Sequence, residues 1–202
     1  GKVISYAAVF EHGEVFGPKK GWMFNKKLSG GGVLMNPGPH LFSVLHSLFG
    51  LPNSIFGTIQ AKYVPDLDDS GEFELEHENF SGKVSLSWSV PNKAISQLLL
   101  AIKLEMATIE ATNTDLRITN ANGTTEAINF KDLEAFIPNT FDINPDANGE
   151  AYYIEDRLFI DAVKNKLFIH PAPNDLSAAL QIESIIQNCY KYSTFTYVET
   201  GK

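Results

Sequence analysis

The stretch SGGGVLMNPGPHLF, residues 29–42, decides how the rest of the chain is interpreted. Its three consecutive glycines free the backbone from side-chain sterics, so that another surface can approach closely. An apolar run with the character of a helix, Leu41–Phe49, follows. Gly50 and Pro52 predict the end of that helix, because glycine commonly ends helices and proline cannot continue them. The stretch therefore predicts a glycine-rich turn that leads directly into an apolar helix.

Asn36 and His40 are the candidate catalytic residues of this stretch. They are four residues apart, so both side chains point the same way if the helix already includes Asn36. A polar pair that projects from a glycine-rich helix start into a cleft is a reasonable place for chemistry. Without further context, however, a single histidine on a helix is more often structural than catalytic.

The composition of the chain excludes several classes of protein. It has 202 residues, of which 44% are hydrophobic and 20% are charged, and that length fits one large globular domain. The net charge of -8 argues against nucleic acid or an anionic membrane as partner. No run of about 20 apolar residues predicts a membrane span. The single cysteine, Cys189, excludes an internal disulfide and favours a reducing compartment, and we therefore expect a cytoplasmic protein.

Other chemistries find little support in the sequence. The segment that starts at Asp66 resembles a calcium loop, but its twelfth residue is His77 instead of glutamate. The segment Asn144–Glu155 matches better but begins with asparagine followed by proline. Histidines and cysteine show no zinc spacing, so we expect no metal site. The glycine stretch lacks the lysine of a P-loop and the GxGxxG of a dinucleotide fold, and no GxSxG motif is present.

Much of the chain has the pattern of strands joined by turns. Residues 2–10 and 55–64 are β-branched and apolar, as in buried strands. Residues 72–78 alternate strictly between acidic and other side chains, which predicts one wet and one buried face. Between them, residues 65–71 predict an exposed acidic turn. Further strands are expected at residues 83–90, 115–119, 126–130 and 195–198.

Helices are expected mainly near the C-terminus. Residues 131–148 contain two prolines and predict a long surface loop. Residues 150–165 and 176–192 have apolar side chains at helical spacing, and Cys189 falls on the apolar face of the second helix. The sum is an α+β fold, a mostly antiparallel open sheet with helices on one face.

The pattern GGG-x-L-x-[D/N]-x-G-x-H, followed by an apolar helix that ends in glycine, resembles the substrate domain of the Gfo/Idh/MocA oxidoreductases. The resemblance covers nearly all of residues 1–202. On the side of the family, it covers only the second of the two domains. It implies an open sheet like that of the C-terminal domain of glyceraldehyde-3-phosphate dehydrogenase. It also implies a substrate-binding and oligomerisation domain, a homodimer or homotetramer formed through the open sheet face, and NAD or NADP bound mainly by an N-terminal dinucleotide-binding domain that this chain lacks.

The resemblance also assigns roles to individual residues. His40 corresponds to the family's acid/base histidine, and a histidine with its ordinary pKa of ~6.5 suits removal of a hydroxyl proton. Asn36 takes the place of an acidic residue that positions substrate or imidazole. Trp22, Gly31 and Gly32, together with Asn36, are expected to border the substrate. A lysine from the first domain completes the site in the family.

Residues 93–112 allow two interpretations. Local propensity favours a helix through residues 97–106. The resemblance instead favours two strands, residues 98–104 and 108–111, although the turn between them lacks the glycine usual in the family. We expect the strands.

Two functions remain open from the sequence. One is an NAD(P)-dependent oxidoreductase that acts by hydride transfer on a sugar-like or polyol alcohol, with His40 as acid/base. The other is a non-catalytic ligand-binding or scaffold protein that keeps the domain but has lost the chemistry. Asn36 motivates the second, because an amide carries no charge to stabilise an imidazolium.

Overall fold

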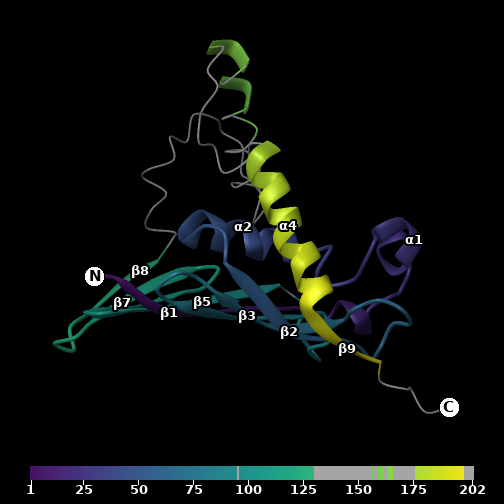
Figure 1. Ribbon diagram of the computed structural model, residues 1–202, viewed down its shortest axis with the longest axis horizontal. Coiled ribbons are helices and arrows are strands. Elements are labelled where there is room, and N and C mark those ends of the chain that lie inside the picture. Colours follow the sequence, from purple (N-terminus) through teal and green to yellow (C-terminus); the bar gives the residue numbers. More distant parts are fainter. Residues whose placement is uncertain (95, 130–155, 157–158, 162, 166–175, 198–202) are drawn as a thin grey trace.

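The computed structural model describes residues 1–94, 96–129, 156, 159–161, 163–165 and 176–197. In this part of the chain the strands form one nine-stranded sheet in the order β8-β7-β6-β5-β1-β4-β3-β2-β9 (Figure 1). The strands are β1 (Val3–Glu11), β2 (Ser54–Ala61), β3 (Ser70–Glu76), β4 (Ser81–Ser87), β5 (Gln97–Leu104), β6 (Ala107–Ala111), β7 (Asp115–Asn120), β8 (Thr125–Asn129) and β9 (Ser193–Tyr197).

The sheet is mostly antiparallel, as the sequence predicts. Only the β1–β4 and β2–β9 pairs are parallel; the other neighbours are antiparallel, as expected for strands joined by short turns. The alternation predicted at residues 72–78 is present in β3, where Phe73 and Leu75 are buried while Glu72 is exposed. The predicted α+β fold class is confirmed.

Two helices cover one face of the sheet (Figure 1). These are α2 (Gly38–Phe49) and α4 (Leu176–Tyr192), which pack against each other above the strands. The short helix α1 (Lys26–Ser29) precedes the glycine stretch. The core lies between the helices and the sheet and includes Phe42 and Leu45 of α2 and Ile186 of α4. Among the described helices, none is long and apolar enough to cross a membrane.

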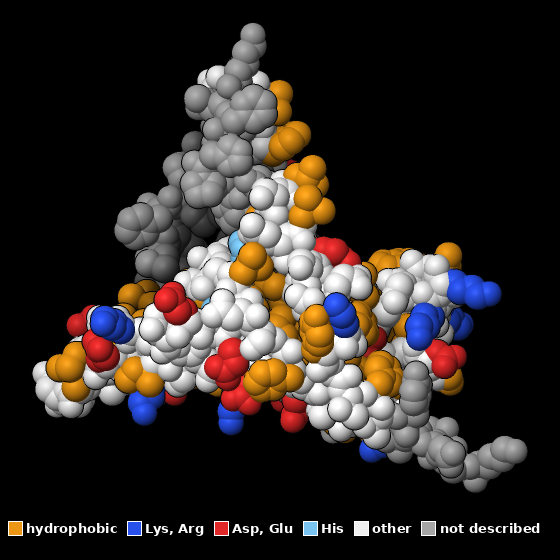
Figure 2. All heavy atoms as spheres, viewed as in Figure 1, with side chains coloured by type: hydrophobic (Ala, Val, Ile, Leu, Met, Phe, Trp, Pro, Cys, Tyr) orange, Lys and Arg blue, Asp and Glu red, His pale blue; other side chains and the backbone are white. Residues whose placement is uncertain are grey.

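The opposite face of the sheet carries no helix among the described residues (Figure 1). It is shallowly hollowed around Ala7, and the hollow, of about 470 Å³, is lined in part by Glu72, Glu74 and Lys83. Figure 2 shows acidic and basic side chains mixed along this side of the molecule. The face therefore carries charges of both signs beside apolar side chains such as Phe56, which is 45% exposed.

Residues 93–112 contain strands, and the helix that local propensity favours does not form. Strand β5 spans Gln97–Leu104 and pairs with β1, and β6 spans Ala107–Ala111. Leu100 and Ile102 are buried on the helix side of the sheet. Burial of one face between two strand neighbours outweighs an intrinsic helix preference of a few tenths of a kcal/mol per residue.

The exposed acidic turn predicted at residues 65–71 is wrong for its central residues. Asp68 is 3% exposed and Asp69 is 1% exposed. Both oxygens of Asp68 and Oδ2 of Asp69 accept hydrogen bonds from backbone N–H groups, which compensates for lost hydration; Asp69 Oδ1 has no partner among the described residues. Strand β2 also ends at Ala61, before the predicted end at residue 64.

Several predictions near the C-terminus fall outside the described residues. They include the loop at residues 131–148, the calcium-like segment 144–155 and residue 198 of the last strand. Of the predicted helix 150–165, the residues that the structure describes (156, 159–161 and 163–165) are helical.

Leu45→Ala should destabilise the protein by about 2–5 kcal/mol, because Leu45 is 2% exposed in the core under α2 and its truncation leaves a cavity. Leu48→Ala is the matched control on the same helix; Leu48 is 53% exposed, and a change within about 0.5 kcal/mol is expected. Urea unfolding followed by circular dichroism measures both. Equal losses for the two variants would contradict the packing described here.

Candidate functional site

The glycine stretch is held by a single buried residue, Asp68. The backbone N–H of Gly32 donates to Asp68 Oδ1 at 2.7 Å, and that of Leu34 donates to Oδ2 at 2.8 Å. Between them, the N–H of Val33 donates to the backbone carbonyl of Asp68 at 2.8 Å. Three consecutive amides of the loop are therefore bound to one residue, which leaves the loop little freedom.

Tyr190 of α4 joins the same carboxylate. Its hydroxyl donates to Asp68 Oδ1 at 2.8 Å. Burial, together with the charge of Asp68 and this hydrogen bond, raises the pKa of Tyr190 far above its ordinary value, so the hydroxyl stays a donor. The neighbouring Cys189 is completely buried, as predicted, and burial raises the pKa of its thiol to about 12.

The close approach of these groups explains two of the three glycines. A Cβ at position 32 would overlap the carbonyl oxygen of Asp68, and one at position 31 would overlap the hydroxyl of Tyr190. Gly31 and Gly32 are both buried. The structure gives them a packing role, and their contact with substrate stays a prediction.

The loop leads into α2 through two further backbone bonds. The N–H of Asn36 donates to the carbonyl of Gly32 at 3.1 Å, and that of Gly38 donates to the carbonyl of Val33 at 3.0 Å. Helix α2 begins at Gly38, so Asn36 lies in the preceding turn and not in the helix, whereas His40 lies in its first turn. Neither side chain hydrogen-bonds to any residue that the structure describes.

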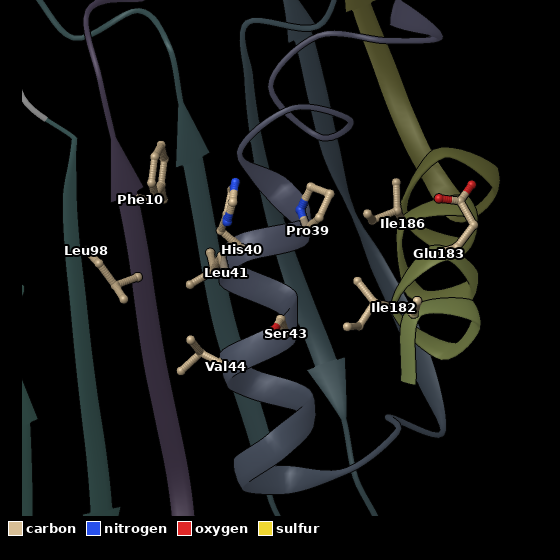
Figure 3. A pocket seen from close by; sticks show the side chains of 11 residues that line it. Phe10, Pro39, His40, Leu41, Ser43, Val44, Leu98, Ile182, Glu183 and Ile186 are labelled. Atoms are coloured by element: carbon tan, nitrogen blue, oxygen red, sulfur yellow. The ribbon is translucent and has the colours of Figure 1, made fainter. Parts of the chain in front are cut away.

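His40 stands exposed at a groove of about 580 Å³ between α2, α4 and the sheet (Figure 3). Figure 3 shows the imidazole at the start of α2 on the side of Phe10, with Glu183 farther away on α4. The walls of the groove are mostly apolar. Glu183 is an acidic residue of the lining, and its carboxylate accepts a hydrogen bond from the side chain of Gln187 at 2.7 Å. The lining residues are Phe10, Pro39, His40, Leu41, Ser43, Val44, Leu98, Ala179, Ile182, Glu183 and Ile186.

Of the five predicted site residues, only His40 lines this groove. Trp22 is 58% exposed in a short 3-10 turn, η2 (Trp22–Phe24), outside the groove. Asn36 is half-buried and also lies outside its lining. The sequence patterns did not predict that α4 forms one wall of the groove, through Ala179, Ile182, Glu183 and Ile186, or that Asp68 holds the glycine loop. The helical spacing at residues 176–192 could have indicated the wall, but no local signal marks Asp68.

The glycine loop offers no cradle for the pyrophosphate of a dinucleotide. Such a cradle needs free backbone N–H groups, as at the glycine-rich start of a helix. Here the amides of Gly32, Val33 and Leu34 already donate to Asp68. Within the described part of the chain, no group of three or more His, Cys, Asp or Glu side chains is placed to hold a metal ion.

Gly32→Ala should lower the free energy of unfolding by about 2 kcal/mol, because the added Cβ meets backbone and not a flexible side chain. Gly17→Ala is the control, since a Cβ there lies 3.4 Å from the nearest atom, the carbonyl oxygen of Glu14, and a change of less than about 1 kcal/mol is expected. Differential scanning calorimetry compares them. A Gly32→Ala protein as stable as Gly17→Ala would show that the loop does not pack as described.

Comparison with known proteins shows what this fold resembles. The family model described as GFO/IDH/MocA C-terminal domain matches residues 1–110. No curated protein matches the chain. Among solved structures, levoglucosan dehydrogenase in complex with NADH and levoglucosan is similar with a TM-score of 0.79 and 15% identity, over 95% of this chain and 57% of that one.

Two further solved structures have a similar fold. An NAD binding oxidoreductase from Klebsiella pneumoniae has a TM-score of 0.77 and 15% identity, over 95% of this chain and 57% of that one. The 3-ketoreductase KijD10 from Actinomadura kijaniata, in complex with NADP and TDP-benzene, has a TM-score of 0.73 and 12% identity, over 98% and 56%. The chain thus spans less than two thirds of the length of these proteins. Since the family model matches more than half of the chain, the chain belongs to the GFO/IDH/MocA family and represents its C-terminal domain.

Proposed function

We propose that this chain is the substrate-binding domain of an NAD(P)-dependent oxidoreductase that acts on the CH–OH group of a sugar-like or polyol substrate. The observation that carries the proposal is His40, an exposed imidazole without a hydrogen-bond partner among the described residues, at the edge of a groove between two helices. The similar structures support it, because they include a levoglucosan dehydrogenase solved with NADH and a sugar, and a 3-ketoreductase solved with NADP.

In the proposed reaction, His40 accepts the proton of the substrate hydroxyl while the carbon becomes a carbonyl. Neither ring nitrogen has a hydrogen-bond partner among the described residues, so one is available for that proton. The apolar walls, including Leu41 and Ile182, exclude water from one side of the groove. Asn36 lies in the turn that leads to His40 and can hydrogen-bond a substrate hydroxyl through its amide. The nicotinamide cofactor, when bound, supplies the hydride acceptor.

The cofactor is bound mainly by a domain outside this chain. The occupied amides of Gly32, Val33 and Leu34 support this assignment, because they leave no phosphate cradle in the glycine loop. The share of the similar structures that this chain leaves uncovered is large enough for such a domain. A cytoplasmic location stays a prediction from the single cysteine.

The second candidate function, a non-catalytic ligand-binding or scaffold protein, rests on Asn36. An amide cannot stabilise an imidazolium by charge as a carboxylate does. Exchange of a supporting aspartate for asparagine behind a catalytic histidine can reduce turnover by about 10⁴-fold. The groove would then bind a sugar without converting it.

His40→Ala in the full-length protein should reduce kcat by about 10²–10⁴-fold, because it removes the acid/base group. The assay is absorbance of NADH or NADPH at saturating sugar. His46→Ala is the control on the same helix, and a change in kcat within about twofold is expected. A wild-type protein that binds sugars but oxidises or reduces none would favour the scaffold function.

Asn36→Asp separates the two functions further. In an active enzyme, added negative charge near His40 should raise kcat or shift the pH profile of kcat/KM. Activity that appears only in Asn36→Asp would indicate that the natural protein has lost its chemistry. Activity in the wild type that His40→Ala abolishes would exclude the scaffold function.

We also propose that the open sheet face binds a second copy of the chain, giving a homodimer or homotetramer. Charge complementarity supports this partner. Glu74 of β3 lies directly opposite Lys83 of β4 in the register, so both signs are present on one face. Two copies related by a two-fold axis present the same mixed surface to each other and can pair opposite charges.

Ala7→Arg should weaken the dimer at least tenfold, because Ala7 lies exposed on the central strand β1 and lines the hollow of that face. The measurement is light scattering coupled to size-exclusion chromatography over a range of concentrations. Ala121→Arg, at an exposed position beyond β7, is the matched control and should leave the oligomer intact. An unchanged mass for Ala7→Arg would exclude this face as the interface.

A further inference from the structure

We propose that Asp68 and Tyr190 are positioning residues that set the placement of His40 relative to the α4 wall of the groove. The proposal rests on the proposed function, because it assumes that His40 acts on a bound sugar. Neither residue lines the groove, so each acts through the elements that it joins.

The first link runs from Asp68 to His40 through the backbone. Asp68 binds three successive amides, from Gly32 to Leu34. The carbonyls of Gly32 and Val33 then accept from the first amides of the turn that becomes α2. The N–H of His40 in turn donates to the carbonyl of Pro37 at 3.1 Å. A shift of Asp68 would therefore move the first turn of α2 and His40 with it.

The second link runs from Asp68 to the opposite wall. Tyr190 lies on α4, the helix that also supplies Ile182, Glu183 and Ile186 to the groove. Its hydroxyl bond to Asp68 ties that helix to the loop in front of α2. The absence of a side chain at Gly31 permits the short approach. One carboxylate thus fixes both walls of the groove against each other.

Asp68 is itself held in place by its neighbour. Asp69 Oδ2 accepts from the backbone N–H groups of Lys62 and Tyr63, each at 2.6 Å. The backbone N–H of Asp69 donates to the carbonyl of Gln60 at 2.9 Å. The turn between β2 and β3 is therefore bonded at several points, and hydrogen bonds of a buried carboxylate to N–H groups are among the stronger ones. Asp68 has a rigid base from which to position the loop.

The test is Tyr190→Phe in the full-length protein, which removes one hydroxyl and keeps the ring. We expect kcat/KM for the sugar substrate to fall about 10–100-fold, because small displacements of a reacting group are costly. Tyr192→Phe, an exposed tyrosine on the same helix, is the matched control and should change kcat/KM less than twofold. Asp68→Asn, with Asp66→Asn as its control, should reproduce the loss, since an amide N–H₂ cannot accept from the loop.

A double-mutant cycle separates positioning from general stability. In a His40→Ala background, Tyr190→Phe should lower the residual kcat less than twofold, because there is no imidazole left to misplace. The same 10–100-fold loss with and without His40 would overturn the proposal. So would a Tyr190→Phe protein whose kcat/KM equals that of Tyr192→Phe.

A second readout keeps the proposal testable if the wild type has no turnover, which would reject the proposed function by itself. Amide hydrogen exchange at Gly32, Val33 and Leu34 should be at least tenfold faster in Tyr190→Phe than in Tyr192→Phe. Equal protection of these amides in the two variants would reject the positioning role independently of any activity.

Discussion

The structure depends on a buried carboxylate that organises three distant segments. Asp68 accepts from the amides of Gly32 and Leu34 and from the hydroxyl of Tyr190. A carboxylate removed from water is costly unless its oxygens find donors, and here each oxygen has at least one. The same bonds satisfy amides that a tight glycine-rich loop would otherwise bury without partners. The carboxylate of Asp68 thus supplies acceptors for the loop amides, and the loop amides supply donors for the buried carboxylate.

The sheet is the platform on which this cluster acts. Nine strands among the described residues form one layer, and α2 and α4 cover one of its faces. The groove with His40 lies where the two helices meet the strands. Its apolar lining continues from the core. The candidate site is this groove between the two helices and the sheet, and His40 lines it.

Asn36 is the residue that separates the two proposed functions. The structure puts it in the turn before α2, half-buried, one turn ahead of the exposed His40. An amide there can orient a hydroxyl but adds no negative charge. Glu183 lines the same groove but is bonded to Gln187 and lies apart from His40 in Figure 3. In the described residues His40 has no carboxylate partner.

Local pattern was sufficient for the fold class and for the apolar helix that follows the glycine stretch, whereas the role of His40 came from the family resemblance and stays a prediction. The alternation at residues 72–78 predicts the buried face of one strand, and the apolar run after Pro39 predicts the buried face of one helix. Each pattern involves only residues that are close together in the chain. Contacts between distant residues decided the rest. The bond from Tyr190 to Asp68 joins residues 122 positions apart, and those from Gly32 and Leu34 to Asp68 span 36 and 34. From the local sequence, an acidic turn is predicted to be exposed. A carboxylate can be buried only if hydrogen-bond donors reach it, and here those donors come from residues far away in the chain.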